Sequence, residues 1–497
     1  MKSMDYLIVC FGVLMVMSVA AQTSPSDSLP RPAPVQGSLR VHPENPRYFS
    51  DGMKHSDGSF KAVFLTGSHT WANLIDRGHS DPPPVFDFDG YLDLMEKHHH
   101  NFIRLWGRQV SWYHDYGEGE LHAAPLAWSR TGPGNALDGK PKFDLTKLNQ
   151  AYFDRLRARV TAARDRGIYV GVMLFGGSYE CRGGWRGNPF NIQNNVNGVN
   201  GDPSGDGEGR ESHTLELPVI TRLQEAYVRK VIDTVNDLDN VLYEISNEGE
   251  DSSKEWQYHL IRFIHDHEAA KPKQHPVGMT AIGRGDAESN KVLSASPAEW
   301  ISPHTAAWGG VGNTRIAEGT KVSLLDSDHW FVVELYNDPA LGRQWVWKSF
   351  CRGHNPILME HLPPQSMVLS DCPLTLDDPG YVASREAMGH TRRFAERMNL
   401  AAMTPQSELT STTYCLANVG VEYLIYQPQT SGSFSVELEA GKYQYEWFDP
   451  VKGTASASGA IEATGDAQEF KTPFEGEAVL YLKAWVQVVD STTNEPR

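Results

Sequence analysis

Eight short apolar runs, each followed by a segment with helical spacing, constrain the fold of this chain more than any other feature. The runs are typical of buried parallel strands. They cover residues 61–67, 101–106, 168–174, 241–246, 276–281, 299–303, 321–325 and 356–359. Helical patterns, with apolar residues three or four positions apart, cover residues 148–166, 217–236, 253–270 and 381–399. Eightfold alternation of strand and helix predicts an α/β fold, the closed (β/α)8 or TIM barrel.

The chain also contains a second domain. At 497 residues it is longer than a barrel alone requires, because this barrel usually takes about 250 residues. Beyond residue 400 the helical spacing stops, and alternating apolar and polar residues appear between turn signals. This pattern predicts a small antiparallel β-sandwich. We therefore expect a barrel at residues 41–400, a sandwich at residues 401–487 and a polar tail at residues 488–497.

The N-terminus has the composition of an export signal. A charged start precedes an apolar run at residues 6–19, and a small-residue pattern suited to cleavage ends at Ala21. The run is shorter than the roughly 20 apolar residues that a membrane span requires. We expect a signal peptide at residues 1–21 and a linker rich in Pro and Ser at residues 22–40. The mature protein is then exported (periplasmic, cell-surface or extracellular) and has no membrane span.

Composition and missing motifs exclude several classes of function. The formal net charge of −17 argues against nucleic acid or an anionic membrane as a partner. The absence of a Gly-x-Ser-x-Gly elbow and of a Gly-rich phosphate loop disfavours serine esterases and nucleotide-binding proteins. The cysteines match no zinc pattern. The sequence predicts neither a metal nor a cofactor, and it leaves the disulfides and the oligomeric state open.

The sharpest polar signal lies at the end of the fourth predicted strand, where Asn247 and Glu248 follow a buried apolar run. In a barrel of this kind, the loops after the strands build the active site. Glycosidic cleavage needs one carboxylic acid that protonates the leaving oxygen and a second carboxylate across the bond. Glu248 fits the first role, and Asn247 fits a donor to a sugar hydroxyl. The alternative is that Glu248 only begins an acidic loop.

Aromatic and histidine side chains collect at the same predicted rim. Indole rings can pack against the C–H faces of sugars, although a single Trp is as often a core residue. The histidines either bind hydroxyls and tune the carboxylates or are structural. The residues that we assign to substrate binding are Asn247, Arg104, His69, Trp71, Trp106, His304, Trp308, His329 and Trp330. Long insertions at residues 107–147 and 176–213 add aromatics that we expect to be exposed, namely Trp112, Tyr113, Trp128 and Trp185.

These residues carry a resemblance to known enzymes. Asn247 and Glu248 after strand four, with Arg104 in strand two and His304 after strand six, resemble the clan of barrel glycosidases that includes cellulases and β-galactosidases. A closer similarity is to the apiosidase-like glycoside hydrolases, whose C-terminal sandwich is of the collagen-binding type. It rests on residues 64–71, 299–303, 325–330, 345–350, 445–450 and 480–482, and spans roughly residues 40–485. The resemblance implies a glycosidase with Glu248 as acid/base.

The second carboxylate is less well defined. The clan places a Glu after strand seven, whereas strand seven here is followed by Asp326 and Asp328. Asp328 is then the natural candidate, with Asp326 directed into the barrel or orienting a neighbour. If one predicted strand is false, Glu360 takes the position of the clan's Glu. A carboxyl separation of about 5 Å would give retention of configuration, and one of about 7–9 Å inversion.

We therefore predict a secreted glycoside hydrolase that cleaves O-glycosidic bonds in a plant or algal cell-wall polysaccharide or its oligosaccharides. The catalytic candidates are Glu248, Asp328 and Glu360. The alternative is a non-catalytic carbohydrate-binding or adhesion protein, in which the sandwich binds the ligand. The sugar, the linkage and the choice between endo and exo attack stay open.

Overall fold

The computed structural model describes residues 33–115, 119–283, 287–305, 313–328, 332–360, 379–428 and 432–485. The predicted signal peptide and the predicted tail after residue 487 lie outside these ranges. Three predicted substrate-binding residues, Trp308, His329 and Trp330, also lie outside them.

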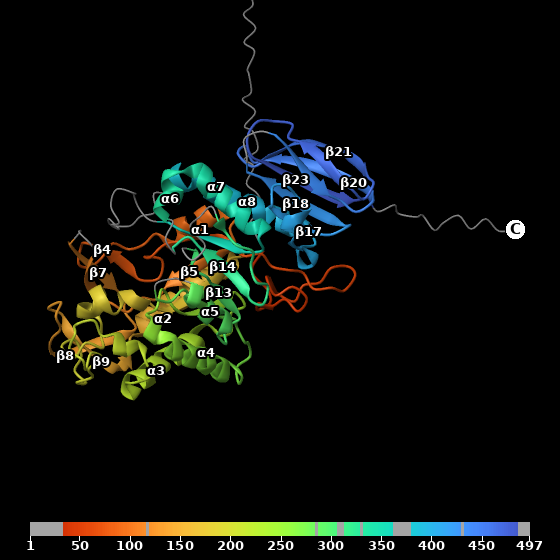
Figure 1. Cartoon of the computed structure of the whole chain (residues 1–497). Coiled ribbons are helices and arrows are strands. Elements are labelled where there is room, and N and C mark those ends of the chain that lie inside the picture. The colour runs from red at the N-terminus through yellow and green to blue at the C-terminus, as the bar shows by residue number, and fades with distance from the viewer. Residues whose placement is uncertain are drawn as a thin grey trace, which may run out of the picture. The chain divides into compact units, whose positions relative to one another are not determined.

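A parallel eight-stranded sheet forms the wall of the barrel (Figure 1). Around the sheet its strands are β3 (Gly67–His69), β5 (Phe102–Trp106), β10 (Tyr169–Phe175), β11 (Val241–Ser246), β12 (Val277–Thr280), β13 (Trp300–Ser302), β14 (Val322–Asp326) and β15 (Asn355–Met359). β15 pairs with β3. The Asn101 N–H beside β5 donates to the Thr66 carbonyl beside β3 at 3.0 Å. The predicted TIM barrel is confirmed, although its first strand begins later than predicted.

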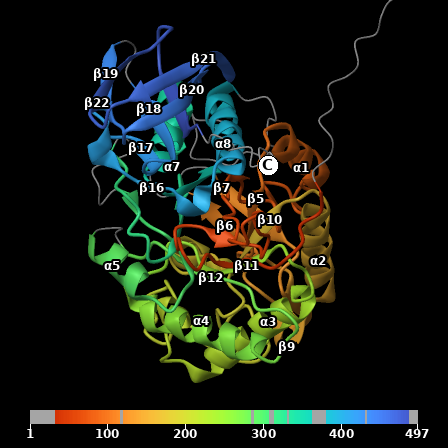
Figure 2. The ribbon, with the colours of Figure 1, turned by 90° about the vertical axis from the view of Figure 1, so that its right-hand side faces the viewer.

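Helices cover the outside of this wall, and Figure 2 shows them arranged around the strands. They are α1 (Phe88–Lys97), α2 (Gln150–Asp165), α3 (Pro218–Val235), α4 (Lys254–Glu268), α5 (Ala287–Ala295), α6 (Val332–Asn337), α7 (Pro339–Cys351) and α8 (Pro379–Arg397). The Asn149 side chain caps α2, and Pro218 opens α3. The four predicted helices are confirmed. Within the described residues, no helix combines the length and the apolar character of a membrane span.

The barrel interior is divided into an apolar layer and a polar layer. Side chains that alternate along the strands place Phe102, Val322 and Leu324 in one buried cluster with Trp300. Gly278 makes room for the Trp300 ring, because a Cβ there would lie 1.9 Å from it. Toward the carboxyl ends of the strands the inward residues become polar. This change places the acidic and basic side chains at the face where barrel enzymes carry their sites.

The long insertions after β5 and β10 fold onto the barrel. The insertion after β5 contains β6 (Trp112–Asp115), β7 (Gly119–Ala124), β8 (Trp128–Asn135) and β9 (Pro141–Leu148), and the insertion after β10 contains η1 (Gly177–Tyr179), η2 (Arg182–Gly187) and η3 (Arg210–His213). Three short strands lie outside the insertions: β1 (Arg40–Val41) and β2 (Phe49–Ser50) before the barrel, and β4 (Asp76–Gly78) after β3. The expectation of exposed aromatics here was wrong. Trp112, Tyr113, Trp128 and Trp185 are buried. Trp128, for example, packs on Phe190 and on Tyr227 of α3.

The predicted linker is shorter than expected at its C-terminal end. Within residues 33–40, Val35 and Leu39 are buried, and the Val35 N–H donates to the Arg164 carbonyl at 3.0 Å. Ordered contacts with the barrel therefore begin before residue 41.

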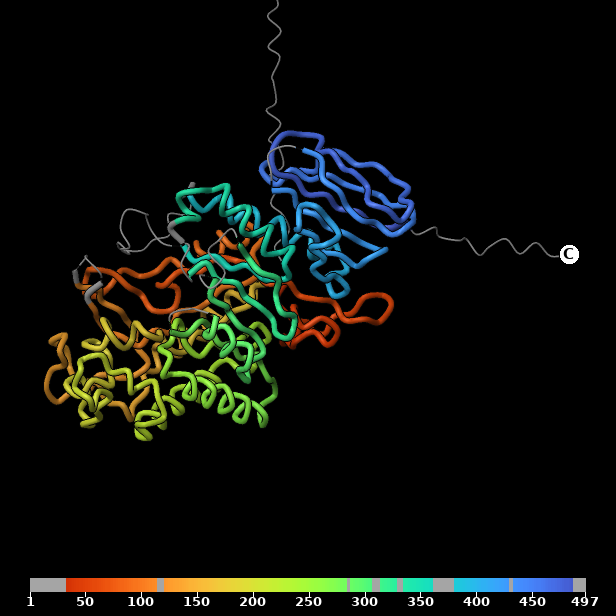
Figure 3. Tube along the Cα trace, viewed as in Figure 1, coloured from red at the N-terminus to blue at the C-terminus, as the bar shows by residue number. Residues whose placement is uncertain are grey.

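The C-terminal part is an antiparallel sandwich, and Figure 3 traces the chain through it. One sheet contains β16 (Thr404–Pro405), β17 (Cys415–Asn418), β18 (Glu422–Gln427), β23 (Ala478–Ala484), β20 (Gly441–Asp449) and β21 (Thr454–Ala463), and the other β19 (Ser433–Glu437) and β22 (Ala467–Lys471). Phe434 and Trp447 pack between the sheets. Trp347 of α7 stacks on Tyr426 of the sandwich at 6.0 Å, so the sandwich braces a barrel helix.

Candidate active site

Asn247 and Glu248 form the turn that follows β11. Glu248 has a φ of 42°, in the left-handed region that residues with a Cβ rarely adopt. Backbone hydrogen bonds hold the turn, since the Asn247 N–H donates to the Phe175 carbonyl and the Ser178 N–H donates to the Glu248 carbonyl, both at 3.2 Å. Such a conformation costs about 1–3 kcal/mol and persists at functional sites that the surrounding structure enforces.

Arg104, inside β5, joins the acidic side chains of the polar layer. Its guanidinium is buried and donates to both oxygens of Glu244, from Nε at 2.8 Å and from Nη2. Nη1 donates to Asp326 at 2.6 Å, and Nη2 also donates to Asn247 Oδ1 at 3.0 Å. Because Arg104 engages the amide oxygen of Asn247, the amide nitrogen is the group that can donate to a ligand.

His69, at the end of β3, lies between Trp106 and Asp326. The Trp106 indole N–H donates to His69 Nδ1 at 3.1 Å, and His69 Nε2 lies 3.0 Å from Asp326. An indole nitrogen only donates, so the His69 proton sits on Nε2 and points at Asp326. His69 and Trp106 are buried and use their polar atoms on protein partners. Together with Arg104, His69 holds the buried Asp326 in the polar layer, and the two alternatives predicted for Asp326 are both compatible with these contacts.

Asp328 follows β14 and is the more accessible of the two aspartates. Its backbone N–H donates to Asp326 at 2.9 Å, and its Oδ2 lies 4.0 Å from Arg104 Nη1. No donor among the described residues makes a hydrogen bond to this buried oxygen. An oxygen that faces a guanidinium but accepts no hydrogen bond is available to water or to a substrate.

Burial and nearby negative charges raise the pKa values of both candidate carboxyls, Glu248 and Asp328. Burial, and next the negative charge of Asp328, raise the pKa of Glu248 to about 8. Burial, and next the charge of Asp326, raise the pKa of Asp328 to about 6. At neutral pH, Glu248 therefore holds its proton while Asp328 is ionised. Two carboxyls whose environments separate their pKa values can act as an acid and a base or nucleophile.

Glu360, the other candidate for the second carboxylate, follows β15. The eight strands are those predicted, so Glu360 follows the eighth strand and not the seventh. Both its oxygens accept hydrogen bonds from Arg385 of α8, with Nε to Oε1 at 2.7 Å. Both side chains are buried. The geometry therefore favours Asp328 over Glu360 as the partner of Glu248.

This difference between Asp328 and Glu360 predicts opposite effects on stability. Glu360→Gln is expected to lower the free energy of unfolding by about 3–5 kcal/mol, because Arg385 would remain buried without its counter-ion. Asp328→Asn is expected to leave it unchanged or higher, because the variant removes a charge that burial disfavours. Urea unfolding of both variants at pH near 7 measures the difference. Greater destabilisation by Asp328→Asn would contradict these roles.

An aromatic and cationic rim lies beside these carboxyls, on the loop after β3 and on the insertions after β5 and β10. Trp71 is half-buried and contacts Trp106 and Tyr179 edge-on or tilted, at 6.1 and 6.4 Å. The Arg108 guanidinium lies 4.3 Å from the Tyr179 ring and lowers the pKa of both candidate carboxyls. Sequence reasoning missed Arg108 and Tyr179. The position of Arg108 just after the end of β5 was the signal that could have identified it.

His304 is the remaining predicted substrate-binding residue within the described part of the chain. His304 follows β13 and is buried, and its backbone is held by Asn290, which accepts from the His304 N–H at 2.8 Å and donates to its carbonyl at 3.0 Å. In the insertion after β10, the acidic residues Asp202, Asp206 and Glu211 bring carboxylate oxygens within 4.8 Å of one another. The Asp202 carboxylate is engaged by loop N–H groups, and we assign no metal to it.

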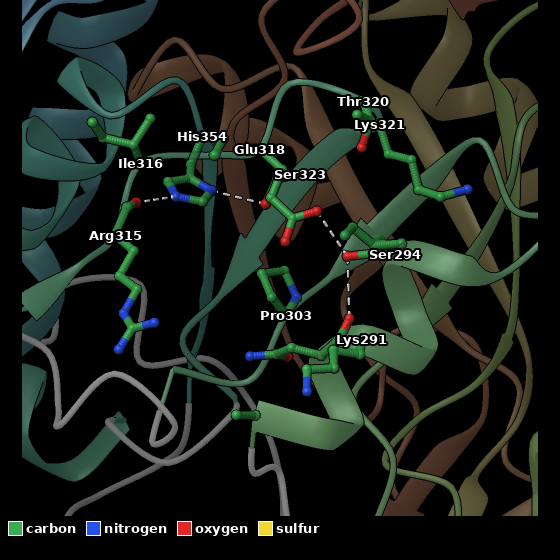
Figure 4. Close-up of a pocket in the computed structure, with 14 residues that line it drawn as sticks. Lys291, Ser294, Pro303, Arg315, Ile316, Glu318, Thr320, Lys321, Ser323 and His354 are labelled. Carbon is green, nitrogen blue, oxygen red and sulfur yellow. Dashed lines mark hydrogen bonds between the residues drawn. The ribbon is translucent and has the colours of Figure 1, made fainter.

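A cavity of about 250 Å³ between α5 and strands β13 and β14 is separate from this site (Figure 4). His354 lines it, accepts from the Ser323 hydroxyl at 2.8 Å and donates to the Arg315 carbonyl at 2.7 Å. Burial lowers the pKa of His354 to about 4. The cavity's described lining contains neither Glu248 nor Asp328.

Comparison with known proteins identifies solved structures that share this fold. A family model described as a domain of unknown function (DUF6298) matches residues 123–284, which include Asn247 and Glu248. No curated protein matches the chain. A solved glycoside hydrolase is 14% identical, with a TM-score of 0.57 over 90% of this chain and 97% of its own. A glycoside hydrolase family 5 protein from Bacteroides vulgatus is 13% identical, with a TM-score of 0.59 over 90% and 94%. The chain shares its fold with barrel glycoside hydrolases.

Proposed function

We propose that this chain is an exported glycoside hydrolase that uses Glu248 and Asp328 to cleave O-glycosidic bonds. The observation that carries the proposal is the pair of carboxyls after β11 and β14, whose pKa values are both raised but to different extents. The shared barrel fold supports it. The resemblance to the apiosidase-like glycoside hydrolases concerns the architecture and the glycosidase chemistry, and we propose a plant or algal cell-wall polysaccharide, or its oligosaccharides, as the substrate class.

The chemistry follows from the protonation states. Glu248 donates its proton to the glycosidic oxygen as the bond to the anomeric carbon breaks. Asp328 either attacks the anomeric carbon, forming a glycosyl ester that water then hydrolyses with Glu248 as base, or takes a proton from a water that attacks this carbon directly. The Asn247 amide donates to a hydroxyl beside the reacting carbon, and Arg104 keeps this amide in place. No step needs a metal or a cofactor.

The raised pKa values predict a bell-shaped pH dependence centred near neutrality. Activity is expected to rise as Asp328 loses its proton near its pKa of about 6, and to fall as Glu248 loses its proton near its pKa of about 8. Measurement of kcat/KM from about pH 4 to about pH 10 reports these values for the unbound enzyme. An optimum below about pH 5 would contradict the proposed proton assignment.

The function itself is tested with a panel of plant and algal cell-wall polysaccharides. The purified mature protein is incubated with each, and the released sugars are identified by chromatography. Release of sugars supports the proposal, and proton NMR of the first product anomer distinguishes retention from inversion, hence nucleophile from base for Asp328. Binding without hydrolysis throughout the panel would favour the carbohydrate-binding alternative.

A further inference from the structure

Another buried acid, Glu180, lies two residues from Ser178, which contacts Glu248. It follows η1 and is 2% exposed. Its Oε1 accepts from the Gly176 N–H at 2.7 Å and from the Gln109 N–H at 2.6 Å. One carboxylate oxygen therefore ties the segment after β10 to the segment after β5. Charge-assisted bonds of this kind are about twice as strong as neutral ones.

The segment that Glu180 holds is in direct contact with the acid/base turn. The Ser178 N–H donates to the Glu248 carbonyl at 3.2 Å. Gly177 has a φ of 62°, and a Cβ at this position would lie 1.4 Å from the Asn247 carbonyl oxygen. Only glycine permits so close an approach. Residues 176–180 thus form the support against which the left-handed Glu248 is held.

A buried histidine, His213, lies beside the second oxygen of Glu180. The second oxygen, Oε2, lies 3.5 Å from His213 Nε2, and His213 Nδ1 lies 3.5 Å from the Cys181 sulfur. The His213 ring stacks on Trp256 at 4.5 Å. Burial acts to lower the pKa of His213, but Cys181 and Glu180 together raise it to about 10. The raised pKa favours the protonated form of His213, whose Nε2 faces the Glu180 carboxyl.

We propose that Glu180 is a positioning residue for Glu248, which it keeps in the left-handed conformation through the turn at residues 176–179. The proposal rests on the proposed glycosidase function of Glu248. Glu180 is buried, and its two oxygens face the Gly176 and Gln109 N–H groups and His213, so it acts through the turn and does not touch the substrate.

The test compares Glu180 with a matched acid at the opposite end of the barrel. Glu268 is also buried and also pairs with a histidine, His275, at 2.9 Å, but this pair lies beside the start of β12. Glu180→Ala is expected to lower kcat about 100-fold with little change in KM, because misplacing a catalytic group by about 1 Å costs this much. Glu180→Gln retains an acceptor oxygen and should lose only about tenfold. Glu268→Ala should lose stability but keep the kcat of the folded enzyme.

Crystal structures of the variants give a second readout that needs no substrate. In Glu180→Ala, we expect loss of the Ser178–Glu248 hydrogen bond and a negative φ at Glu248. If the wild type cuts no polysaccharide, the proposed function fails, and this φ alone decides the role of Glu180. A Glu248 φ that stays positive overturns the positioning role, and so does a kcat within twofold of an active wild type. If Glu180→Ala does not fold, the test uses Glu180→Gln alone. A wild-type kcat and an unchanged Glu248 φ in Glu180→Gln would then overturn the proposal.

Discussion

Replacement of Glu248 by Gln is expected to lower kcat by about 10²–10⁴-fold on natural polysaccharides. Gln has nearly the same shape and can form the same turn, but an amide has no proton to give to the leaving oxygen. KM should change little, because ground-state contacts are kept. Rates on a polysaccharide and on an aryl glycoside with an acidic phenol as leaving group measure the effect. The loss should be much smaller on the aryl glycoside, since its leaving group departs without protonation.

Glu250 offers a matched control two residues away. It is partly buried and pairs with Arg182 at 2.7 Å, outside the polar layer of the barrel. Glu250→Gln is expected to keep kcat within about twofold, because the change removes only an ion pair with the exposed Arg182. Equal losses in Glu248→Gln on both kinds of substrate would argue against the role of Glu248 as general acid.

Removal of the Arg104 guanidinium is expected to destabilise the protein strongly. Arg104→Met leaves Glu244 and Asp326 buried without their counter-ion, and breaking such a buried network costs about 3–5 kcal/mol. Arg104→Lys should recover only part of this loss, because an ammonium cannot match the planar guanidinium that contacts three partners. Urea unfolding at neutral pH measures the free energy of unfolding of each variant.

Arg157 is the control for Arg104. It also makes two hydrogen bonds to one carboxylate, that of Asp237 at 2.7 and 2.8 Å, but both side chains are largely exposed. Arg157→Met is expected to cost at most about 1 kcal/mol. Similar losses in the two variants would show that burial does not set the strength of the Arg104 network.

Local patterns predicted the eight barrel strands, with the largest difference at the first of them. The run at residues 61–67 contains the buried Phe64 and Leu65, yet the paired strand is Gly67–His69. A strand this short is defined by its pairing with β15 and not by its own periodicity. The prediction of exposed aromatics on the insertions was wrong for a related reason. Trp128 is covered by Phe190 and Tyr227, which are distant in sequence.

Part of the candidate site could also be predicted from local patterns, and part could not. Asn247 and Glu248 could be identified because a polar pair after a buried strand is a local pattern. The choice between Asp328 and Glu360 could not be made from the sequence, because it depends on the contact of Glu360 with Arg385 of α8. Arg108 and Glu180 lie in insertions without a recognisable motif, and their roles appear only through their contacts.

The sequence by itself determined the barrel, the sandwich and the acid/base candidate, because strand and helix periodicity and the order of elements are properties of the chain. Only the tertiary structure decided which candidate carboxyl is held by Arg385 and which raises the pKa of Glu248, and it also gives the contacts that surround the positive φ of Glu248. The physical reason is that burial and charge pairing act between residues far apart in sequence. Arg104 and Asp326, 222 positions apart, show this most directly.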